Sequence, residues 1–384
     1  MSRPSRRVAG SSFAIVANGH ADGPAQALRD YLVERAARIV MVTHPLLPEH
    51  GRRHVVTTFE NRGEVRVRTR WTPLRPPASY AIDPLVPLVH PPVDVWFGFN
   101  PLAAARGLLE RRMRRAAAVV LWSVDFTPDR FGEDALLTRV YDRLDRFACR
   151  HADARVELSP RARDARDARL GLGTATPVHV VPMGAWLTRT PVVPTDGIEA
   201  RRIVFLGHLT EGRGTTALLD ALALLRTRGL PLDLDVIGDG DQLPLLKRQT
   251  TRLGLAEAVR FHGYVADHRE VERLLAHGSV AAAPYLAVES SFTRWADPGK
   301  LKAYLAAGLP IVLTDVSPNA QELSREAGAE IVGHTPDDLA AGIERVLASP
   351  EIWRERRDRA LDYVRRFDWP NLFSELFVDL GFHV

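Results

Sequence analysis

Short apolar runs alternate with amphipathic helical stretches along most of this chain, and this alternation restricts the fold more than any other feature. In the first half, the runs with the length and composition of buried strands are 13–17, 38–43, 93–97 and 117–122. Helical stretches at 25–35 and 102–115 lie between them, whereas the proline-rich segment 62–92 fits no element. Such alternation predicts parallel strands joined by helical crossovers. We therefore expect an α/β fold.

A second series of the same kind begins near residue 200. Its predicted strands are 202–206, 232–237, 259–261, 279–283 and 310–314, and the helices between them include 215–226, 271–276 and 298–307. Residues 191–197 carry two prolines and a Thr-Asp-Gly turn, which is typical of a linker. The sequence thus predicts two Rossmann-like domains. In open parallel sheets, ligands bind beyond the carboxyl ends of the strands.

The composition excludes some classes of protein but does not identify a ligand. The 384 residues carry a formal net charge of +4, which suits an anionic ligand or surface but does not indicate nucleic-acid binding. The single cysteine, Cys149, excludes an internal disulfide and a cysteine-based metal site, and is typical of a cytoplasmic protein. We interpret residues 8–17 as a first strand rather than a signal peptide. No apolar run reaches the roughly 18 residues that a membrane span needs.

A glycine turn follows the first strand of the second series. Gly207 ends the strand and a helix begins at about Thr215, where backbone N–H groups favour an anion. His208 and Arg213 flank that helix start, and the forked Arg213 guanidinium suits a diphosphate. A plain turn with a surface arginine explains the same residues.

Two further strand ends carry weaker signals. Gly238 and Gly240 enclose Asp239 in a tight turn that leaves room for a base or a phosphate, although Asp239 also has the position of a helix cap. Phe261 ends the next strand, where main-chain groups suit the edge of a nucleobase. Ordinary structural turns are the alternative at both places.

The segment 297–312 gives the sharpest signal. A polar loop ends at Asp297, Pro298 opens a helix, a glycine stops it and a strand follows. Lys300 lies in the first turn of that helix, where a cation opposes the helix dipole. A bound anion would offset this cost, so we interpret Lys300 as a ligand-binding residue. A solvent-exposed lysine is the alternative.

Taken in order, these motifs resemble those of the group 1 glycosyltransferases. Residues 207–214 are similar to the family's Gly-Arg-Leu-x-x-x-Lys-Gly turn, and Gly238–Gly240 to its Gly-x-Gly turn. Pro298–Val312 is similar to its Pro-x-Lys-x-x-Glu-Tyr-x-Ala-x-Gly-x-Pro-Val-Val segment. The ordered set spans most of residues 200–350 and implies the diphosphate contacts of Gly207, His208, Arg213, Gly238, Gly240 and Lys300.

The resemblance also implies an architecture. In the GT-B fold, two Rossmann-like domains face each other across a cleft. Residues 1–190 are then the acceptor-binding domain and residues 198–355 the domain that binds a nucleotide sugar. The helices in residues 356–384 are expected to pack back on the N-terminal domain.

The chain departs from the family pattern in its charged residues. His208 and Arg213 stand where the family has arginine and lysine, and the family's two glutamates fall at Trp295 and Ala303. One of those glutamates commonly holds the donor ribose. The polar residues available to replace it lie in the preceding loop: Glu289, Ser290, Ser291 and Asp297. Asp297 also has the position of a helix cap, and the stereochemical outcome of transfer stays open.

Two loops of the first half are candidates for acceptor chemistry. Asp125 follows a strand at a place where the family often has a His-Asp pair, and Val124 replaces the histidine. A carboxylate shielded at that place suits a general base, and a structural carboxylate is the alternative. Asn18, Gly19 and His20 follow the first strand and are candidates for acceptor or leaving-phosphate contacts.

Together the residues and the resemblance predict a hexosyltransferase-type enzyme that moves a sugar from a UDP- or GDP-sugar to a hydroxyl group. The acceptor would be a saccharide, a lipid-linked molecule or a small molecule, in polysaccharide, glycolipid or natural-product glycoside synthesis. The resemblance implies no cofactor, no metal ion and no nucleic acid. The missing glutamates leave open a catalytically silent relative that only binds a nucleotide sugar or a polysaccharide. Arginines beside apolar residues in 108–115 leave open peripheral contact with the inner face of a membrane.

Overall fold

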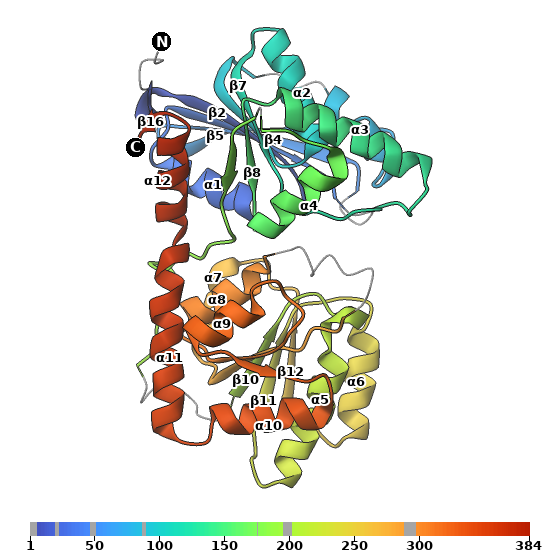
Figure 1. Ribbon diagram of the computed structural model, residues 1–384, viewed down its shortest axis with the longest axis vertical. Helices are drawn as coiled ribbons and strands as arrows, with labels where there is room; N and C mark the ends of the chain where they lie inside the picture. Colours follow the sequence, from blue (N-terminus) through green and yellow to red (C-terminus); the bar gives the residue numbers. More distant parts are fainter. Residues whose placement is uncertain are drawn as a thin grey trace. The chain divides into compact units, whose positions relative to one another are not determined.

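The computed structural model describes residues 6–19, 23–46, 51–86, 90–174, 176–194, 202–287 and 297–384. Their contacts divide the chain into two units. Unit 1 consists of Met1–Pro182 together with Trp369–Val384, and unit 2 of Met183–Asp368 (Figure 1). The division therefore falls earlier than the predicted limit at residue 190.

Unit 1 is built on an eight-stranded sheet in the order β5-β4-β3-β2-β6-β7-β8-β9. The strands are β2 (Ser12–Asn18), β3 (Arg38–His44), β4 (Arg53–Glu60), β5 (Gly63–Trp71), β6 (Val93–Gly98), β7 (Ala116–Trp122), β8 (Ala154–Glu157) and β9 (Val178–Val180). The helices are α1 (Pro24–Val33), α2 (Pro101–Arg112), α3 (Leu136–His151), α4 (Pro160–Leu170) and the 3-10 turns η1 (Val8–Gly10), η3 (Ala78–Ala81) and η4 (Asp83–Leu85). All neighbouring strands in this sheet are parallel except at β4 and β5.

The sequence did not predict the antiparallel β4–β5 hairpin, nor the strands β8 and β9 and the helix α3. Val65 and Val67 of β5 are exposed, so the strand has no buried face that would give it a clear apolar pattern. Elsewhere the predicted strands are confirmed.

Cys149 is buried in α3, and burial raises the pKa of its thiol to about 12.

Unit 2 is a six-stranded parallel sheet in the order β12-β11-β10-β13-β14-β15. Its strands are β10 (Arg202–Leu206), β11 (Asp233–Ile237), β12 (Val259–Gly263), β13 (Val280–Ala283), β14 (Ile311–Thr314) and β15 (Glu330–Val332). Its helices are η6 (Glu211–Arg213), α5 (Thr215–Thr227), α6 (Leu243–Arg252), α7 (His268–Ala276), α8 (Gly299–Ala306), α9 (Ala320–Ala327), α10 (Pro336–Val346), α11 (Pro350–Val364) and η8 (Arg365–Phe367).

Helices cover both faces of this sheet, which explains why its strands read as continuous apolar runs. In β10, Ile203 and Phe205 point into a core shared with α5, α6 and α10. Val204, between them, points into a second core shared with α7, α8, α9 and α11. The two faces are visible in Figure 1. Because all strands of this sheet are parallel, their carboxyl ends lie at the same edge of the sheet.

The end of the chain contributes to both units. In α11, Ala360, Tyr363 and Val364 are buried in the same core as α8 and α9, so residues 356–368 lie in unit 2 and not with the first domain as expected. Only the following helix, α12 (Trp369–Asp379), packs in unit 1, where Phe377 stacks on Tyr31 of α1. Strand β16 (Phe382–His383) then pairs with β1 (Arg6–Arg7).

Candidate functional site

Glycine turns at the carboxyl ends of β10 and β11 contact each other directly. Gly207 N donates a hydrogen bond to Ile237 O at 3.0 Å. A Cβ atom on Gly238 would lie only 2.0 Å from Gly207 O, and the φ angle of +139° at Gly238 is unfavourable for other residues. A Cβ atom on Gly240 would lie 2.4 Å from Leu209 O. The two turns therefore form a surface of bare backbone.

The Lys300 ammonium group lies beside this surface. A Cβ atom on Gly207 would be 3.6 Å from Lys300 Nζ. Nζ sits 4.3 Å from the ring centroid of Tyr285 and 4.6 Å from that of Phe205. It is buried and has no hydrogen-bond partner in the part of the chain that the structure describes. Burial, and then the neighbouring Arg213, hold the pKa of Lys300 well below its ordinary value.

Arg213 approaches the same tyrosine ring as Lys300. Its Cζ atom lies 5.7 Å from the Tyr285 centroid. The turn packs closely against Pro284. A Cβ atom on Gly214 would lie only 1.8 Å from Pro284 O, so this position requires glycine. Two of the predicted cationic residues thus meet around one ring, and an anion placed between them would contact both. His208 is exposed on the same turn.

Asp297 is occupied by protein contacts. Its Oδ2 accepts a hydrogen bond from Met183 N at 2.8 Å, and its Oδ1 accepts from Lys302 Nζ at 2.8 Å and from Asn319 Nδ2 at 3.2 Å. The side chain is 7% exposed. These bonds anchor the start of α8 to the segment that enters unit 2, which favours a structural carboxylate over a ribose contact.

The other predicted donor residues give less information. Phe261 is half-buried and packs against the core beneath α5 and α6, so its contact with a base stays a prediction. Glu289, Ser290 and Ser291 lie outside the described residues, and so does His20.

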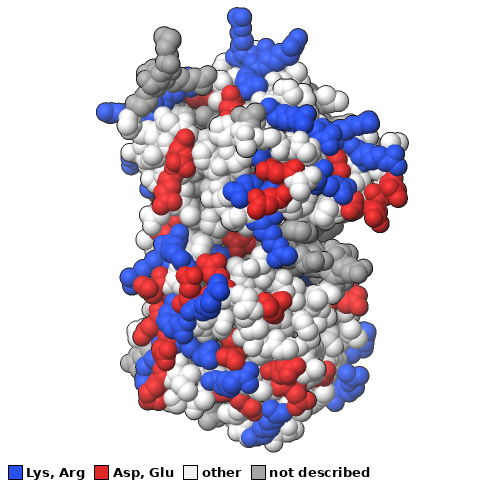
Figure 2. Space-filling view, viewed as in Figure 1, with Lys and Arg blue, Asp and Glu red and all other residues white. Residues whose placement is uncertain are grey.

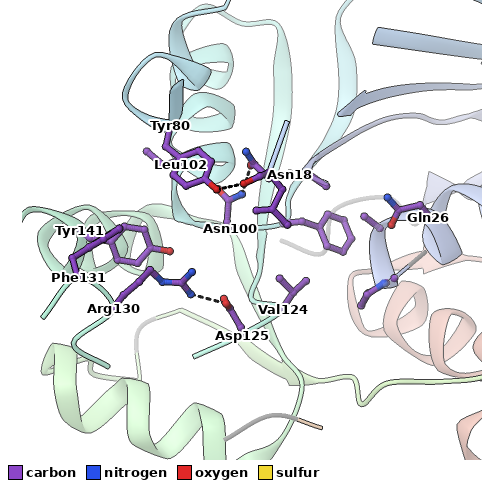
Figure 3. A pocket seen from close by; sticks show the side chains of 16 residues that line it. Asn18, Gln26, Tyr80, Asn100, Leu102, Val124, Asp125, Arg130, Phe131 and Tyr141 are labelled. Carbon is purple, nitrogen blue, oxygen red and sulfur yellow. Dashed lines mark hydrogen bonds and ion pairs between the residues drawn. The ribbon is translucent and has the colours of Figure 1, made fainter. Parts of the chain in front are cut away.

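Unit 1 contains a cavity of about 390 Å³ at the carboxyl ends of β2, β6 and β7 (Figure 3). The sequence candidates Asn18 and Asp125 both line it. The lining residues that sequence reasoning missed are mainly aromatic or polar: Gln26, Tyr80, Phe99, Asn100, Arg130, Phe131 and Tyr141. Of these, Asn100 carried a readable signal, because it precedes a proline after a strand. It caps α2, with Oδ1 accepting from Ala103 N at 2.8 Å.

Asp125 is the only side-chain carboxylate among the described residues that line this cavity. Arg130 Nη2 lies 2.6 Å from Asp125 Oδ2, and the Asp125 side chain is 40% exposed. Burial lowers the pKa of Arg130, but Asp125 and Tyr141 together raise it above its ordinary value. A reachable carboxylate of this kind can accept a proton from a bound hydroxyl group.

Asn18 lines the same cavity, and Gly19 follows it in the chain. Asn18 Oδ1 accepts a hydrogen bond from Asn100 Nδ2 at 2.8 Å, and Asn18 Nδ2 donates to Asp83 Oδ2 at 2.9 Å. Gly19 N donates to His44 O at 2.9 Å. Both residues are thus held in place by the protein. Contact with an acceptor stays a prediction for them.

The arginine-rich end of α2 is largely engaged in ion pairs. Arg111 pairs with Asp153, and Arg115 Nε lies 2.9 Å from Glu110 Oε2. Leu109 and Met113 are exposed beside them. On the face drawn in Figure 2, acidic side chains lie among the basic ones over both units. Among the described residues, no helix is both long and apolar enough to span a membrane.

Comparison with known proteins gives one family and one fold. Residues 200–349 match the family model "Glycosyl transferases group 1". The sucrose-phosphate synthase of Thermosynechococcus elongatus superposes with a TM-score of 0.70 at 16% identity, over 96% of this chain and 99% of that one. Anabaena Alr3699/HepE in complex with UDP superposes with a TM-score of 0.67 at 16% identity, over 97% and 99%.

A third structure agrees with these two. It is described as trehalose-6-phosphate from E. coli bound with UDP-2-fluoro glucose, and it superposes with a TM-score of 0.66 at 14% identity, over 97% and 100% of the chains. No curated protein matches the chain in sequence. The fold shared with these structures is GT-B, and the family match lies on the unit that carries Lys300 and the glycine turns. The chain therefore has the GT-B fold, and its residues 200–349 are similar to the group 1 glycosyltransferases.

Proposed function

We propose that this protein is a glycosyltransferase that moves a sugar from a nucleoside diphosphate sugar of UDP or GDP type to a hydroxyl group of an acceptor. The buried Lys300 ammonium group, beside bare glycine turns and without a hydrogen-bond partner in the described chain, carries the proposal. A cation in this state needs an anion, and a diphosphate also suits the neighbouring Arg213. Structures of the same fold support the donor class, because one holds UDP and another UDP-glucose.

In this reaction the two cations stabilise the negative charge that develops on the leaving nucleoside diphosphate. The acceptor hydroxyl attacks the anomeric carbon and loses its proton, and the bond between that carbon and the diphosphate oxygen breaks. Asp125 is the proposed base. Asn18 and Gly19 are proposed to help form the acceptor site. Because Lys300 and Arg213 supply positive charge, we expect transfer to proceed without a divalent cation at the diphosphate.

The cavity of unit 1 supports a hydroxyl acceptor held against aromatic walls. Its volume of about 390 Å³ suits a molecule of small-ligand size or the end of a longer one. We therefore propose a saccharide, a lipid-linked molecule or a small aglycone as the acceptor. We also propose that the protein acts in the cytoplasm and that α2 makes weak contact with an anionic membrane surface. Flotation of the protein with anionic vesicles tests the membrane contact.

The direct test is binding and turnover of a panel of UDP- and GDP-sugars, measured by calorimetry and by release of the nucleoside diphosphate. We expect one nucleotide class to bind and its sugar to be transferred. Absence of binding by both UDP and GDP would contradict the proposed donor site. Binding of a nucleotide sugar with neither transfer nor hydrolysis over a broad acceptor panel would favour the catalytically silent alternative.

The base is tested by Asp125→Asn, which keeps the shape of the side chain and removes its basicity. We expect the transfer rate to fall about 100- to 10,000-fold, the usual contribution of general base catalysis, with donor affinity unchanged. Asp129→Asn is the matched control, because Asp129 lies in the same loop, pairs with Arg169 and does not line the cavity. Transfer by Asp125→Asn at the rate of this control would remove Asp125 as the base.

A further inference from the structure

Three side chains of metal-ligand type, which the transfer reaction does not use, meet inside unit 1. His44 ends β3, His54 lies in β4 and Asp83 opens η4. All three are buried, with the His54 side chain fully inaccessible. His44 Nδ1 and His54 Nδ1 are 2.7 Å apart, and Asp83 Oδ1 lies 3.7 Å from His54 Nδ1 and 4.0 Å from His44 Nδ1. One potential ligand atom of each residue therefore faces the same point.

The hydrogen bonds of His54 fix its tautomer. Thr72 Oγ1 lies 3.0 Å from His54 Nε2, and the Thr72 hydroxyl donates its proton to Leu74 O at 3.2 Å. A hydroxyl has one proton, so it can only accept from His54, which must carry its proton on Nε2. His54 Nδ1 then has a lone pair, which accepts a hydrogen bond from His44 Nδ1 at 2.7 Å; a metal ion would take the place of that proton. The Nε2-protonated form of His54 is the tautomer of a metal-binding histidine whose second nitrogen is held by an outer partner.

One carboxylate oxygen of Asp83 accepts no hydrogen bond from the described residues. Its Oδ2 accepts a hydrogen bond from Asn18 Nδ2, but its Oδ1 is buried and has no hydrogen-bond partner within the described ranges. A buried carboxylate oxygen in this state costs free energy unless a positive group approaches it. Both neighbouring imidazole nitrogens lie too far from it for a hydrogen bond.

The geometry points to a metal ion. For a triangle with sides of 2.7, 3.7 and 4.0 Å, the point equidistant from the three atoms lies about 2.1 Å from each, which matches zinc–nitrogen and zinc–oxygen bond lengths. Two imidazoles and one carboxylate favour zinc and its transition-metal neighbours over magnesium or calcium. We propose that His44, His54 and Asp83 bind one divalent transition-metal ion, with zinc as the preferred ion.

The proposed ion has a structural consequence. It would join the strands β3 and β4 to η4, which lies outside the sheet. The Asn18–Asp83 hydrogen bond would pass this restraint to the wall of the cavity in unit 1. The site is independent of the donor-binding unit, so it does not rest on the proposed function and no step of sugar transfer passes through the ion.

The test uses the full chain, without a histidine tag, stripped of metal by a chelator and then desalted after exposure to zinc. We expect about one zinc per chain by elemental analysis, and a rise in the unfolding temperature on zinc addition. With Co²⁺ as the probe, we expect visible absorption bands from nitrogen and oxygen ligation. His54→Ala and Asp83→Asn should lose all three signals.

His262→Ala is the matched control, because His262 also contacts a buried carboxylate, Asp235, but at 2.9 Å in unit 2 and without a second histidine. It should bind zinc as the wild type does. The proposal is overturned if stripped wild-type protein, folded by circular dichroism, takes up no zinc. It is also overturned if Asp83→Asn binds as much zinc as the wild type. Since the first outcome needs only the wild type, misfolding of a variant cannot hide the answer.

Discussion

Helix α8 carries two lysines, Lys300 and Lys302, whose surroundings differ. Lys302 Nζ lies 2.8 Å from Asp297 Oδ1, and the Lys302 side chain is 2% exposed. On the side facing the glycine turns, Lys300 Nζ lies between the rings of Phe205 and Tyr285, with no hydrogen-bond partner in the described chain. Residue type and helix are the same, but Lys302 is a fully buried residue with an acidic partner, whereas Lys300 is partly buried and its inaccessible Nζ atom has none.

The difference distinguishes a cation that has a partner within the protein from one that has none among the described residues. A buried ion pair is complete within the folded protein, and losing one partner leaves an uncompensated charge. A buried ammonium group without a partner is unfavourable in the folded protein until an anion arrives. We therefore infer that Lys302 has a structural role, and we propose that Lys300 is retained for binding at the expense of stability.

The largest expected effect in this comparison belongs to Lys302→Met. The substitution keeps most of the side-chain volume but leaves the Asp297 carboxylate buried without its cation. We expect the free energy of unfolding to fall by about 3–5 kcal/mol, the usual cost of breaking a buried pair. Denaturant titration measures this. A loss below about 1 kcal/mol, typical of exposed pairs, would erase the distinction between the two lysines.

Lys300→Met should give the opposite pattern. We expect the affinity for UDP or GDP to fall about 10- to 150-fold, equivalent to loss of a charged hydrogen bond of about 1.5–3 kcal/mol. The free energy of unfolding without nucleotide should stay the same or increase, because an unpaired buried cation is removed. Calorimetry and denaturant titration together decide the outcome. If nucleotide affinity is unchanged, Lys300 has no role at the diphosphate.

The smallest effect is a pH dependence of nucleotide binding. Burial and Arg213 lower the pKa of Lys300 in the free protein, and a bound diphosphate raises that pKa again. Binding should therefore take up protons, and affinity should fall as pH rises through the range between the lowered pKa and the ordinary lysine value of about 10.4. Calorimetry in two buffers with different heats of protonation measures the uptake. Equal uptake by wild type and Lys300→Met would assign it to another group.

The sequence by itself determined most of the parallel strands, several of the helices between them and the glycine turns of unit 2, but not β8, β9 or β15. Strands buried on both faces and amphipathic helices leave local patterns, and a turn such as Gly238 tolerates no other residue because backbone atoms lie against it. The position of Lys300 in the first turn of a helix was equally local. These features need no knowledge of distant contacts.

Only the tertiary structure decided which charged groups have partners. Asp297 is bound by Lys302 and by Met183, and the hydrogen bond with Met183 spans 114 positions, which no sequence window contains. The β4–β5 hairpin has too little buried surface to leave an apolar pattern, and it brings His54 to His44, where Asp83 joins them. Local sequence reports which face of an element is apolar, but the partner of a buried charge is fixed only when separate elements pack together.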